Sequence, residues 1–488
     1  MSDLAPLLVA IPLLGSVLVL LAGLAREKTG WAVAVLTSLA QVAMAGSLAN
    51  QVFLDGTISY VVGGFTAPFG IELVVDGLSA TMAMLVAVVA LGVLAYARSA
   101  GPRSNAFYAT YLLLIAGLSG MSITGDVFNM YVFLEITGLA AYALVASGQG
   151  GRAALAALKY LVVGTVGASL FLLGIGYAYI ATGTLNMADL SAQLAAVGYT
   201  SPLVQAAFGL LVVGLFVKVA VFPVHTWQPT AYAGAPDSVS ALISALVSTV
   251  AAYALIRIVF TVFTVGFLEA NPLARTVLLT GAAVSIVFGS LLAVTQDEIK
   301  RMLAYSSVSQ FGLVVAAVGI ANGTALTGAM IHLVGQAIMK GGLFLTTGLV
   351  ADVTGARTVD EYEGLAERLP VGAGAFGVLG VAMVGVPPAV GFVGKWYVAF
   401  GAIQAESWPL AVVILVSTLL TLAYFVRVLE RAYFRDPPAD APEVEGPPHV
   451  SVGMQATVLV AAALAVALGV AAFEYGELLA PTIESLLS

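Results

Sequence analysis

The sequence predicts an all-α polytopic membrane protein of about fourteen transmembrane helices, with two inverted five-helix repeats and two broken helices. Its mean hydropathy is +1.04 and only 9% of its 488 residues are charged, so the apolar surface is too large for one aqueous core. Apolar runs of about 20 residues, the length that crosses a bilayer as a helix, recur from Leu4–Ala25 to Val450–Phe473. The first run has neither a basic leader nor a clear cleavage site, so we expect a retained helix and not a signal peptide.

Basic residues in the loops predict the topology, because cytoplasmic loops are rich in Lys and Arg. Alternate loops carry Arg26, Lys28, Arg98, Arg103, Arg152, Lys159, Lys300, Arg301, Arg357, Arg368, Arg427, Arg431 and Arg435. The opposite loops carry essentially only Arg275. Both termini are therefore expected outside, with the acidic loops at 351–370 and 434–449 in the cytoplasm.

The chain divides in order into four parts. They are helices 1–3 (residues 1–105), a first repeat of helices 4–8 (106–263), a second repeat of helices 9–13 (264–434), and an acidic loop with helix 14 (435–488). The repeats are suggested by two spans that proline interrupts near a lysine. Lys218 precedes Pro223 by five residues, and Lys395 follows Pro388 by seven. These spans are five helices apart and so oppositely oriented, and such paired breaks point to an inverted-repeat transporter with its site near the midplane.

Four ionisable residues stand alone in apolar runs. Glu135 has no charged neighbour from Val127 to Gly151, and Lys218, Lys340 and Lys395 are three of only six lysines. Charges at membrane depth are costly and usually serve an ion path or proton relay. The alternatives are a structural carboxyl bonded to a neighbouring helix for Glu135, and for Lys218 a long side chain that reaches the interface. Paired with Glu135, Lys218 would bind and release a proton as its partner moves.

Further polar residues predict a path between these charges. His332, Gln336 and Lys340 are spaced i, i+4, i+8 and share one helical stripe, which suits a hydrated wire, although hydrogen bonds between helices would also explain it. His225, in FPVHTWQP, follows the first break and would either join the path or cap a helix end. Asp76 precedes a span and is expected to be an N-terminal cap without a transport role.

Other functions are disfavoured by composition. Cysteine is absent, which excludes disulfides, thiolate metal sites and cysteine catalysis. The net charge of -8 argues against a nucleic-acid partner. With three widely separated histidines and no nucleotide loop, we expect no metal site, no cofactor and no enzyme activity of the chain itself.

Four segments together resemble the proton-conducting membrane transporter family shared by Mrp-type cation/proton antiporters, respiratory complex I and membrane-bound hydrogenases. They are TGDVFNMYVFLEI, KVAVFPVHTWQPTAYAGAP, QDEIKRMLAYSSVSQFG and GVPPAVGFVGKW. The resemblance covers essentially the whole chain. Within the family it is most similar to the D-type component of Mrp antiporters, because of GGFTAPFGIELVVDGLSATM and TGTLNMADL.

The resemblance implies roles for the isolated charges. Glu135 and Lys218 would form the proton-uptake element, Lys340 would lie on the connecting axis, and Lys395 would be the distal lysine. Two positions depart from the family pattern: Thr249 stands where a lysine is common, and Gln336 where many relatives carry a second histidine. The central relay is therefore less charged than usual.

We expect a proton-translocating subunit of a multisubunit Na+/H+ antiporter in a prokaryotic plasma membrane, working with other membrane subunits. The first alternative is the proton-pumping membrane subunit of a redox-driven complex, related to complex I or a membrane-bound hydrogenase. The second is a structural subunit whose channel has decayed at Thr249. From Lys218, Thr249 and Ser248 would hand protons on through ordered water, with Ser244 one helical turn earlier on the face of Ser248.

Overall fold

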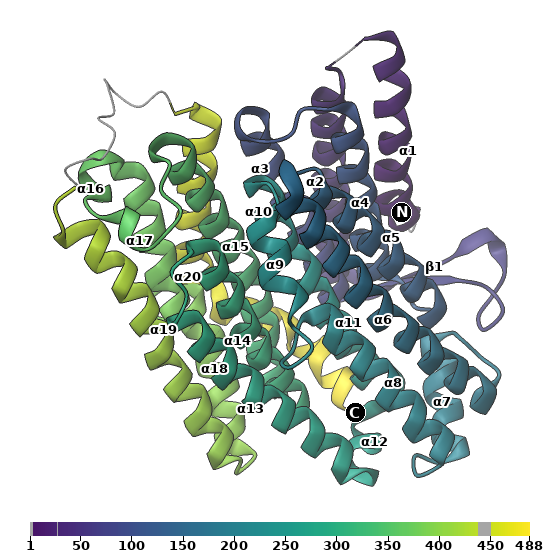
Figure 1. Ribbon diagram of the computed structural model, residues 1–488. Helices are drawn as coiled ribbons and strands as arrows, with labels where there is room; N and C mark the ends of the chain where they lie inside the picture. The colour runs from purple at the N-terminus through teal and green to yellow at the C-terminus, as the bar shows by residue number, and fades with distance from the viewer. Residues whose placement is uncertain (1–2, 27, 438–449) are drawn as a thin grey trace.

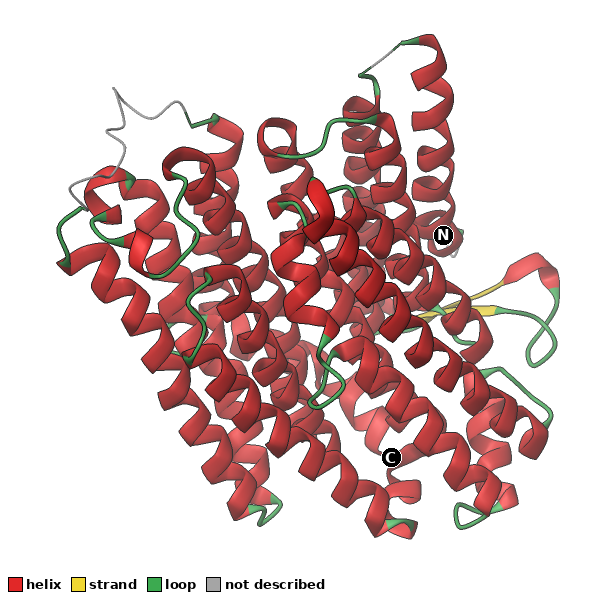
Figure 2. Ribbon diagram, in the orientation of Figure 1, coloured by secondary structure: helices red, strands yellow, loops and turns green. Residues whose placement is uncertain are grey.

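The chain is a bundle of helices with one small hairpin (Figure 2). The computed structural model describes residues 3–26, 28–437 and 450–488. Thirteen helices in these ranges are long and apolar enough to cross a membrane. A fourteenth span combines α17 (Pro370–Val384) and α18 (Val390–Gln404), each of 15 residues. One such helix reaches about 22 Å and cannot cross a core of about 30 Å alone. The predicted all-α membrane protein is thus confirmed.

The N-terminal part consists of four helices and the hairpin. The helices are α1 (Leu4–Ala25), α2 (Gly30–Asp55), α3 (Gly77–Ala100) and α4 (Asn105–Ile123). Strands β1 (Ile58–Val61) and β2 (Glu72–Val75) pair antiparallel, with Ser59 opposite Val74, and the short helix η1 (Val62–Gly64) follows β1. The hairpin projects from the side of the bundle (Figure 2).

The middle part contains the first broken span. It begins with five helices, α5 (Val127–Ala146), α6 (Gly150–Thr182), α7 (Met187–Val197), α8 (Pro202–Val219) and α9 (Trp227–Gly234). One long helix follows, made of α10 (Asp237–Leu242), the π-helix η2 (Ile243–Val247), α11 (Ser248–Arg257), the π-helix η3 (Ile258–Phe263) and α12 (Thr264–Ala270). A π-turn inserts a residue and changes which side chains share a face. Ser244 lies in this π-helix and donates to the Ala241 carbonyl within its own helix. The expectation that Ser244 and Ser248 share approximately one face stays a prediction.

The C-terminal part contains the second broken span. It comprises α13 (Pro272–Val294), α14 (Ile299–Ile320), α15 (Gly323–Thr354), η4 (Asp360–Tyr362), α16 (Leu365–Arg368), α17, α18, α19 (Trp408–Phe434) and α20 (Val452–Leu487). The last helix continues beyond the predicted end at Phe473, since the charged residues after it remain helical. Most of the predicted acidic loop, residues 438–449, lies outside the described residues.

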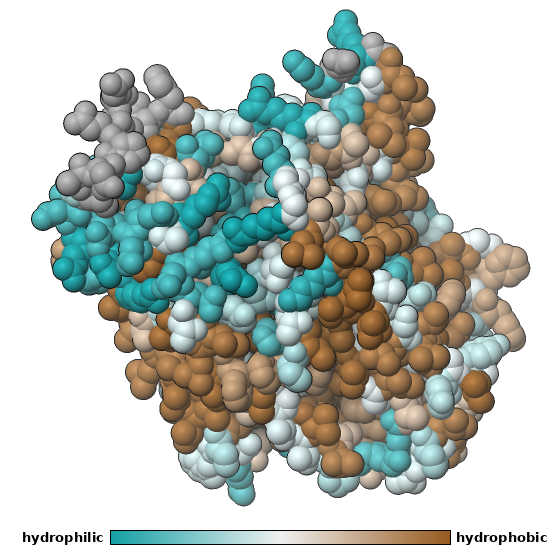
Figure 3. Space-filling view, viewed as in Figure 1, coloured by the Kyte–Doolittle hydropathy of each residue, from teal (hydrophilic) through white to brown (hydrophobic). Residues whose placement is uncertain are grey.

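Burial separates an inner from an outer set of helices. The most apolar window of Asp237–Ala270 is wholly buried, whereas that of α1 is 22% buried. The helices α14 and α15 are nearly as buried as α11, and α20 packs against α3, α15, α17 and α18, which joins distant parts of the chain (Figure 1). Figure 3 shows hydrophobic residues along the flank, whereas hydrophilic residues gather at the end where α16 lies. Polar side chains on the inner helices are therefore shielded from lipid.

Both predicted breaks are confirmed. The first follows Val219, where Ala220 takes a left-handed conformation (φ 68°), and the second follows Val384, where Gly385 does so (φ 96°). The two inverted repeats and the four domain boundaries stay predictions.

Candidate ion-translocation site

The first element of the site is an ion pair between α5 and α8, in which Lys218 is buried and Glu135 is partly exposed. Lys218 Nζ lies 3.7 Å from Glu135 Oε1, and the Lys218 side chain is 8% exposed. Lys218 also donates a hydrogen bond of 3.2 Å to the hydroxyl of Tyr142, two turns beyond Glu135 on α5. Gly138 makes this approach possible, because a Cβ atom there would lie 3.3 Å from Lys218 Nζ. The structure thus brings the predicted pair together and adds Tyr142, which the sequence analysis missed.

The first helix break places Lys218 at a helix C-terminus. Lys218 occupies the last turn of α8, and the C-terminal end of a helix favours a cation. The carbonyl oxygen of Val217 accepts a hydrogen bond of 2.8 Å from Trp227 Nε1 at the start of α9. The break is therefore held by a side chain from the far side of the loop.

A cluster of polar side chains follows Lys218 toward the centre of the bundle. Gln228 Nε2 donates to the hydroxyls of Tyr232 (3.1 Å) and Ser248 (3.2 Å), and these hydroxyls are 3.3 Å apart. Ser248 Oγ also lies 3.5 Å from the backbone carbonyl of Lys218. This cluster connects the broken span to α11, next to Thr249.

Several buried polar atoms in the inner helices lack a hydrogen-bond partner among the described residues. They are Thr249 Oγ1 and both side-chain polar atoms of Gln310, His332 and Gln336. All four side chains are at most 1% exposed. An unsatisfied buried polar group is costly, and a buried water that makes two to four hydrogen bonds is the usual remedy. These atoms fit a hydrated path, and Gln310 is a member that the sequence analysis did not find.

Lys340 is the most buried of the predicted lysines. Its ammonium donates to the Leu303 carbonyl (2.8 Å) and to Ser306 Oγ, both on α14. Within the described residues Lys340 has no carboxylate partner in an ion pair. It is therefore a fully enclosed amino group held by neutral oxygens.

Lys395 reaches back across the second break. Its ammonium donates to the carbonyls of Met383 (2.7 Å) and Val384 (3.2 Å), in the last turn of α17. His332 adjoins this lysine, because a Cβ atom at Gly394 would lie 2.9 Å from His332 Cα. The predicted stripe on α15 therefore meets α18 beside Lys395.

His225 lies apart from these contacts. Its ring stacks on Phe222 with centroids 5.0 Å apart and meets Tyr305 edge-on at 5.9 Å. His225 Nδ1 is buried and without a partner in the described part of the chain. The ring is thus packed against aromatic side chains, and its backbone carbonyl accepts from Gln228 N at 2.9 Å.

Two further buried ion pairs were missed. Arg257 on α11 pairs with Asp76, and Lys300 on α14 lies 2.9 Å from Asp237. Asp76 is also the predicted cap of α3, accepting from Leu78 N (3.1 Å) and Ser79 N (2.9 Å). Arg257 stands in the apolar run ALIRIVF, so the criterion that singled out Lys218 would have found it.

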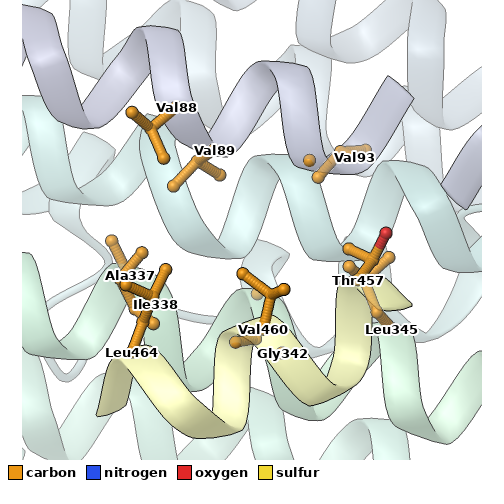
Figure 4. A pocket seen from close by; sticks show the side chains of 13 residues that line it. Val88, Val89, Val93, Ala337, Ile338, Gly342, Leu345, Thr457, Val460 and Leu464 are labelled. Atoms are coloured by element: carbon orange, nitrogen blue, oxygen red, sulfur yellow. The ribbon is translucent and has the colours of Figure 1, made fainter. Parts of the chain in front are cut away.

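An apolar cavity of about 80 Å³ lies between α3, α15 and α20, next to Gly341 and Gly342 (Figure 4). Thr457 carries the only polar side-chain atom among its lining residues, so the cavity is separate from the polar path. Among the described residues no group of three or more His, Asp or Glu side chains could hold a metal ion.

A polytopic helical protein with ionisable residues enclosed near two helix breaks belongs to the class of antiporter-like membrane subunits. Residues 124–421 match the family described as NADH:quinone oxidoreductase/Mrp antiporter, TM. The chain belongs to this family, and the resemblance that its motifs predicted is confirmed.

Two relatives represent the two branches of the family. The chain is 45% identical over 395 residues to the N subunit of NADH-quinone oxidoreductase from Desulforudis audaxviator, covering 80% of this chain and 78% of that protein. It is 32% identical over 499 residues to the D subunit of the Na(+)/H(+) antiporter from Alkalihalophilus pseudofirmus. This match covers 99% of this chain and 98% of that protein.

Two solved structures share the fold over almost the whole length. One is the archaeal membrane-bound sulfane sulfur reductase, with a TM-score of 0.92, 30% identity and coverage of 99% and 98%. The other is the Mrp complex from Dietzia sp., with a TM-score of 0.89, 27% identity and coverage of 100% and 99%. The chain is therefore a cation/proton antiporter-like membrane subunit of this family.

Proposed function

We propose that the chain is the proton-translocating subunit of a multisubunit Na+/H+ antiporter. The observation that carries this proposal is the ion pair of Glu135 with the buried Lys218, 3.7 Å apart beside a helix break. The similarity to the D subunit of a Na(+)/H(+) antiporter over 99% of the chain supports the antiporter assignment. Protons and Na+ or another monovalent cation would be the transported ions.

Lys218 is the reversible proton carrier in this proposal, and Glu135 tunes it electrostatically. Because Lys218 contacts both Glu135 and the Tyr142 hydroxyl, a small movement of α5 relative to α8 would change how well its charge is stabilised. Burial makes such changes large, since the attraction between charges is stronger at low dielectric. A proton is thus held or released according to the position of the carboxylate.

Beyond Lys218 the proton moves through hydroxyls and ordered water. Thr249, His332 and Gln336 would bind that water, because their buried polar atoms have no partner among the described residues. Lys340 receives the proton on the connecting axis, and Lys395 at the second break is the distal member. His225 lies near the first break as a supporting polar group.

The exposure of α5 supports a need for partner subunits. Glu135 is 26% exposed on a helix whose outer face carries Phe128, Val132 and Leu139. A carboxylate facing lipid would be costly, so another membrane protein of the complex would cover this face. The chain would lie in a prokaryotic plasma membrane with both termini outside.

Exchange measured in everted vesicles tests the proposal. Vesicles with the assembled complex carry a fluorescent pH probe, and added Na+ drives proton movement. Lys218→Ala should abolish this movement at normal complex abundance. Normal exchange by that variant would refute the role of Lys218.

The redox-driven alternative is favoured by one specific observation, the 45% identity to a component of NADH-quinone oxidoreductase. In that case the same path would pump protons during electron transfer by partner subunits. Purifying the native complex separates the two functions. Co-purifying flavin or iron–sulfur subunits would support the redox module, whereas Na+-driven exchange without an electron donor supports the antiporter.

A further inference from the structure

A second cavity, which is polar, lies beneath the hairpin and away from the lysines described above. It has a volume of about 120 Å³, and its polar lining comes from Glu72, Ser79, Thr124, Asn186, Tyr253, Arg257 and Thr261. Ala188 on α7 is exposed and also lines it, so the cavity reaches the surface. Thr261 Oγ1 is buried without a partner in the described part of the chain. The walls therefore suit water.

Arg257, which lines this cavity, forms an ion pair with Asp76. Arg257 donates to Asp76 Oδ1, to Ser79 Oγ (3.0 Å) and to the Tyr253 hydroxyl (2.8 Å). Tyr253 in turn donates to the Ser122 carbonyl at 2.7 Å. Arg257 is 7% exposed, so these contacts hold an enclosed guanidinium between the cavity and the helix interior.

Polar side chains on α11 connect that ion pair with the proposed proton path. Thr249, Tyr253 and Arg257 are spaced i, i+4, i+8, and residues at this spacing are neighbours on one face of an α-helix. Four residues advance about 6 Å along the axis. The unpaired hydroxyl of Thr249 thus lies one such step from Tyr253, which lines the cavity, and two steps from Arg257.

We propose that this cavity is the mouth of a second proton outlet, which runs from Thr249 along α11 and is gated by the Arg257–Asp76 pair. The inference rests on the proposed function. At each step one O–H bond would form as another breaks, so protons would pass between waters and hydroxyls with no net change in these groups. The guanidinium in the wall repels cations, hydronium as well as Na+. While Arg257 stays on Asp76, its fixed charge closes the outlet.

Thiol labelling tests whether water fills the cavity, and the chain is suited to it because it has no natural cysteine. In the assembled complex, Ala188→Cys reports which membrane side reaches the mouth. Thr261→Cys should react with a membrane-impermeant thiol reagent from that same side. Val262→Cys is the matched control, because Val262 follows Thr261 in the chain but is fully buried and does not line the cavity. Labelling at Ala188→Cys but not at Thr261→Cys would overturn the proposal.

Labelling also tests whether the cavity conducts. Attaching a bulky group at Thr261→Cys should remove most of the Na+-driven proton movement, whereas the same treatment of Ala188→Cys at the wide mouth should leave more of it. Unchanged exchange after complete labelling of Thr261→Cys would show that the cavity is no outlet.

The gate is tested by neutralising both partners, since removing one would leave a buried charge unpaired. Asn is a good N-cap, and Gln keeps a donor toward Tyr253, so Asp76→Asn with Arg257→Gln preserves the local bonding. Passive proton leak across the vesicles should rise severalfold, and adding Thr249→Val should remove the increase. If the passive proton leak does not increase while complex abundance is normal, the pair is not a gate.

The proposed function fails differently. Normal exchange by the Lys218→Ala variant would refute the proton relay through Lys218. It would not change the labelling pattern that tests the outlet. A failed labelling or leak experiment refutes the outlet while the Lys218→Ala result stands.

Discussion

The ammonium of Lys395 donates a hydrogen bond of 2.7 Å to the carbonyl of Met383, so a lysine of α18 occupies the C-terminal end of α17. The last carbonyls of a helix lack intrahelical partners and favour a cation. Lys218 occupies the same kind of position at the other break, in the last turn of α8. Both breaks therefore place a buried lysine at the C-terminal end of a helix, and at the second break two backbone carbonyls accept hydrogen bonds from it.

Replacing Lys395 tests whether it must lose its proton. Lys395→Ala should abolish Na+-driven proton movement, and Lys395→Arg should restore little of it, because arginine stays protonated. Exchange in everted vesicles, normalised to complex abundance, measures both. Full activity with arginine would mean that Lys395 supplies only a fixed charge at the end of α17.

Glu135→Ala and Lys218→Ala should each reduce exchange to background without preventing assembly. Each change removes one partner of the pair that would hold the proton. The double variant is the control, because it leaves neither charge unpaired. If it assembles normally and is also inactive, misfolding cannot explain the loss. Wild-type exchange by either single variant would remove that residue from the mechanism.

Tyr142→Phe should slow exchange by about tenfold, the effect of a barrier raised by about 1.4 kcal/mol. The change deletes the hydroxyl 3.2 Å from Lys218 but keeps the ring that packs edge-on against Tyr160, 4.5 Å away. The initial rate of Na+-driven pH change is the measurement. Tyr160→Phe is the matched control and should be nearly silent. Equal rates for both variants would exclude a role for the Tyr142 hydroxyl.

Thr249→Val should slow exchange by at least about tenfold, because it removes the hydroxyl that would hold water in the central link. Thr249→Ser keeps that hydroxyl and should be nearly silent. Complex abundance must be equal in the two membranes. If Thr249→Val transports at the normal rate, the proton does not pass this position.

Lys300→Met should lower stability and leave exchange per assembled complex unchanged. The Lys300 ammonium donates to Asp237 (2.9 Å) and to the Ala235 carbonyl (2.7 Å), which ties α14 to the start of α10. Removing one partner of a buried pair costs about 3 kcal/mol. Thermal inactivation of the purified complex should occur at lower temperature. Loss of exchange at normal stability would instead place Lys300 in the proton path.

The sequence by itself determined the class of fold and where its charges stand. Apolar runs specify membrane helices, since a bilayer leaves few other solutions. Proline near Lys218 and Lys395 predicted both breaks, because it disrupts helical hydrogen bonding. The isolation of Glu135 marked it for function, and Asp76 proved to be the cap that its position indicated.

Only the tertiary structure decided which groups meet. Helical spacing specifies a face but not what lies opposite, so the contacts of Lys218 with Tyr142 and of Lys395 with Met383 could not be predicted. The π-turns of η2 likewise depend on packing around Asp237–Ala270, and the sequence pattern did not predict them. The physical reason is that the energy of a buried charge depends on the few oxygens within hydrogen-bond reach, and distant helices supply these oxygens.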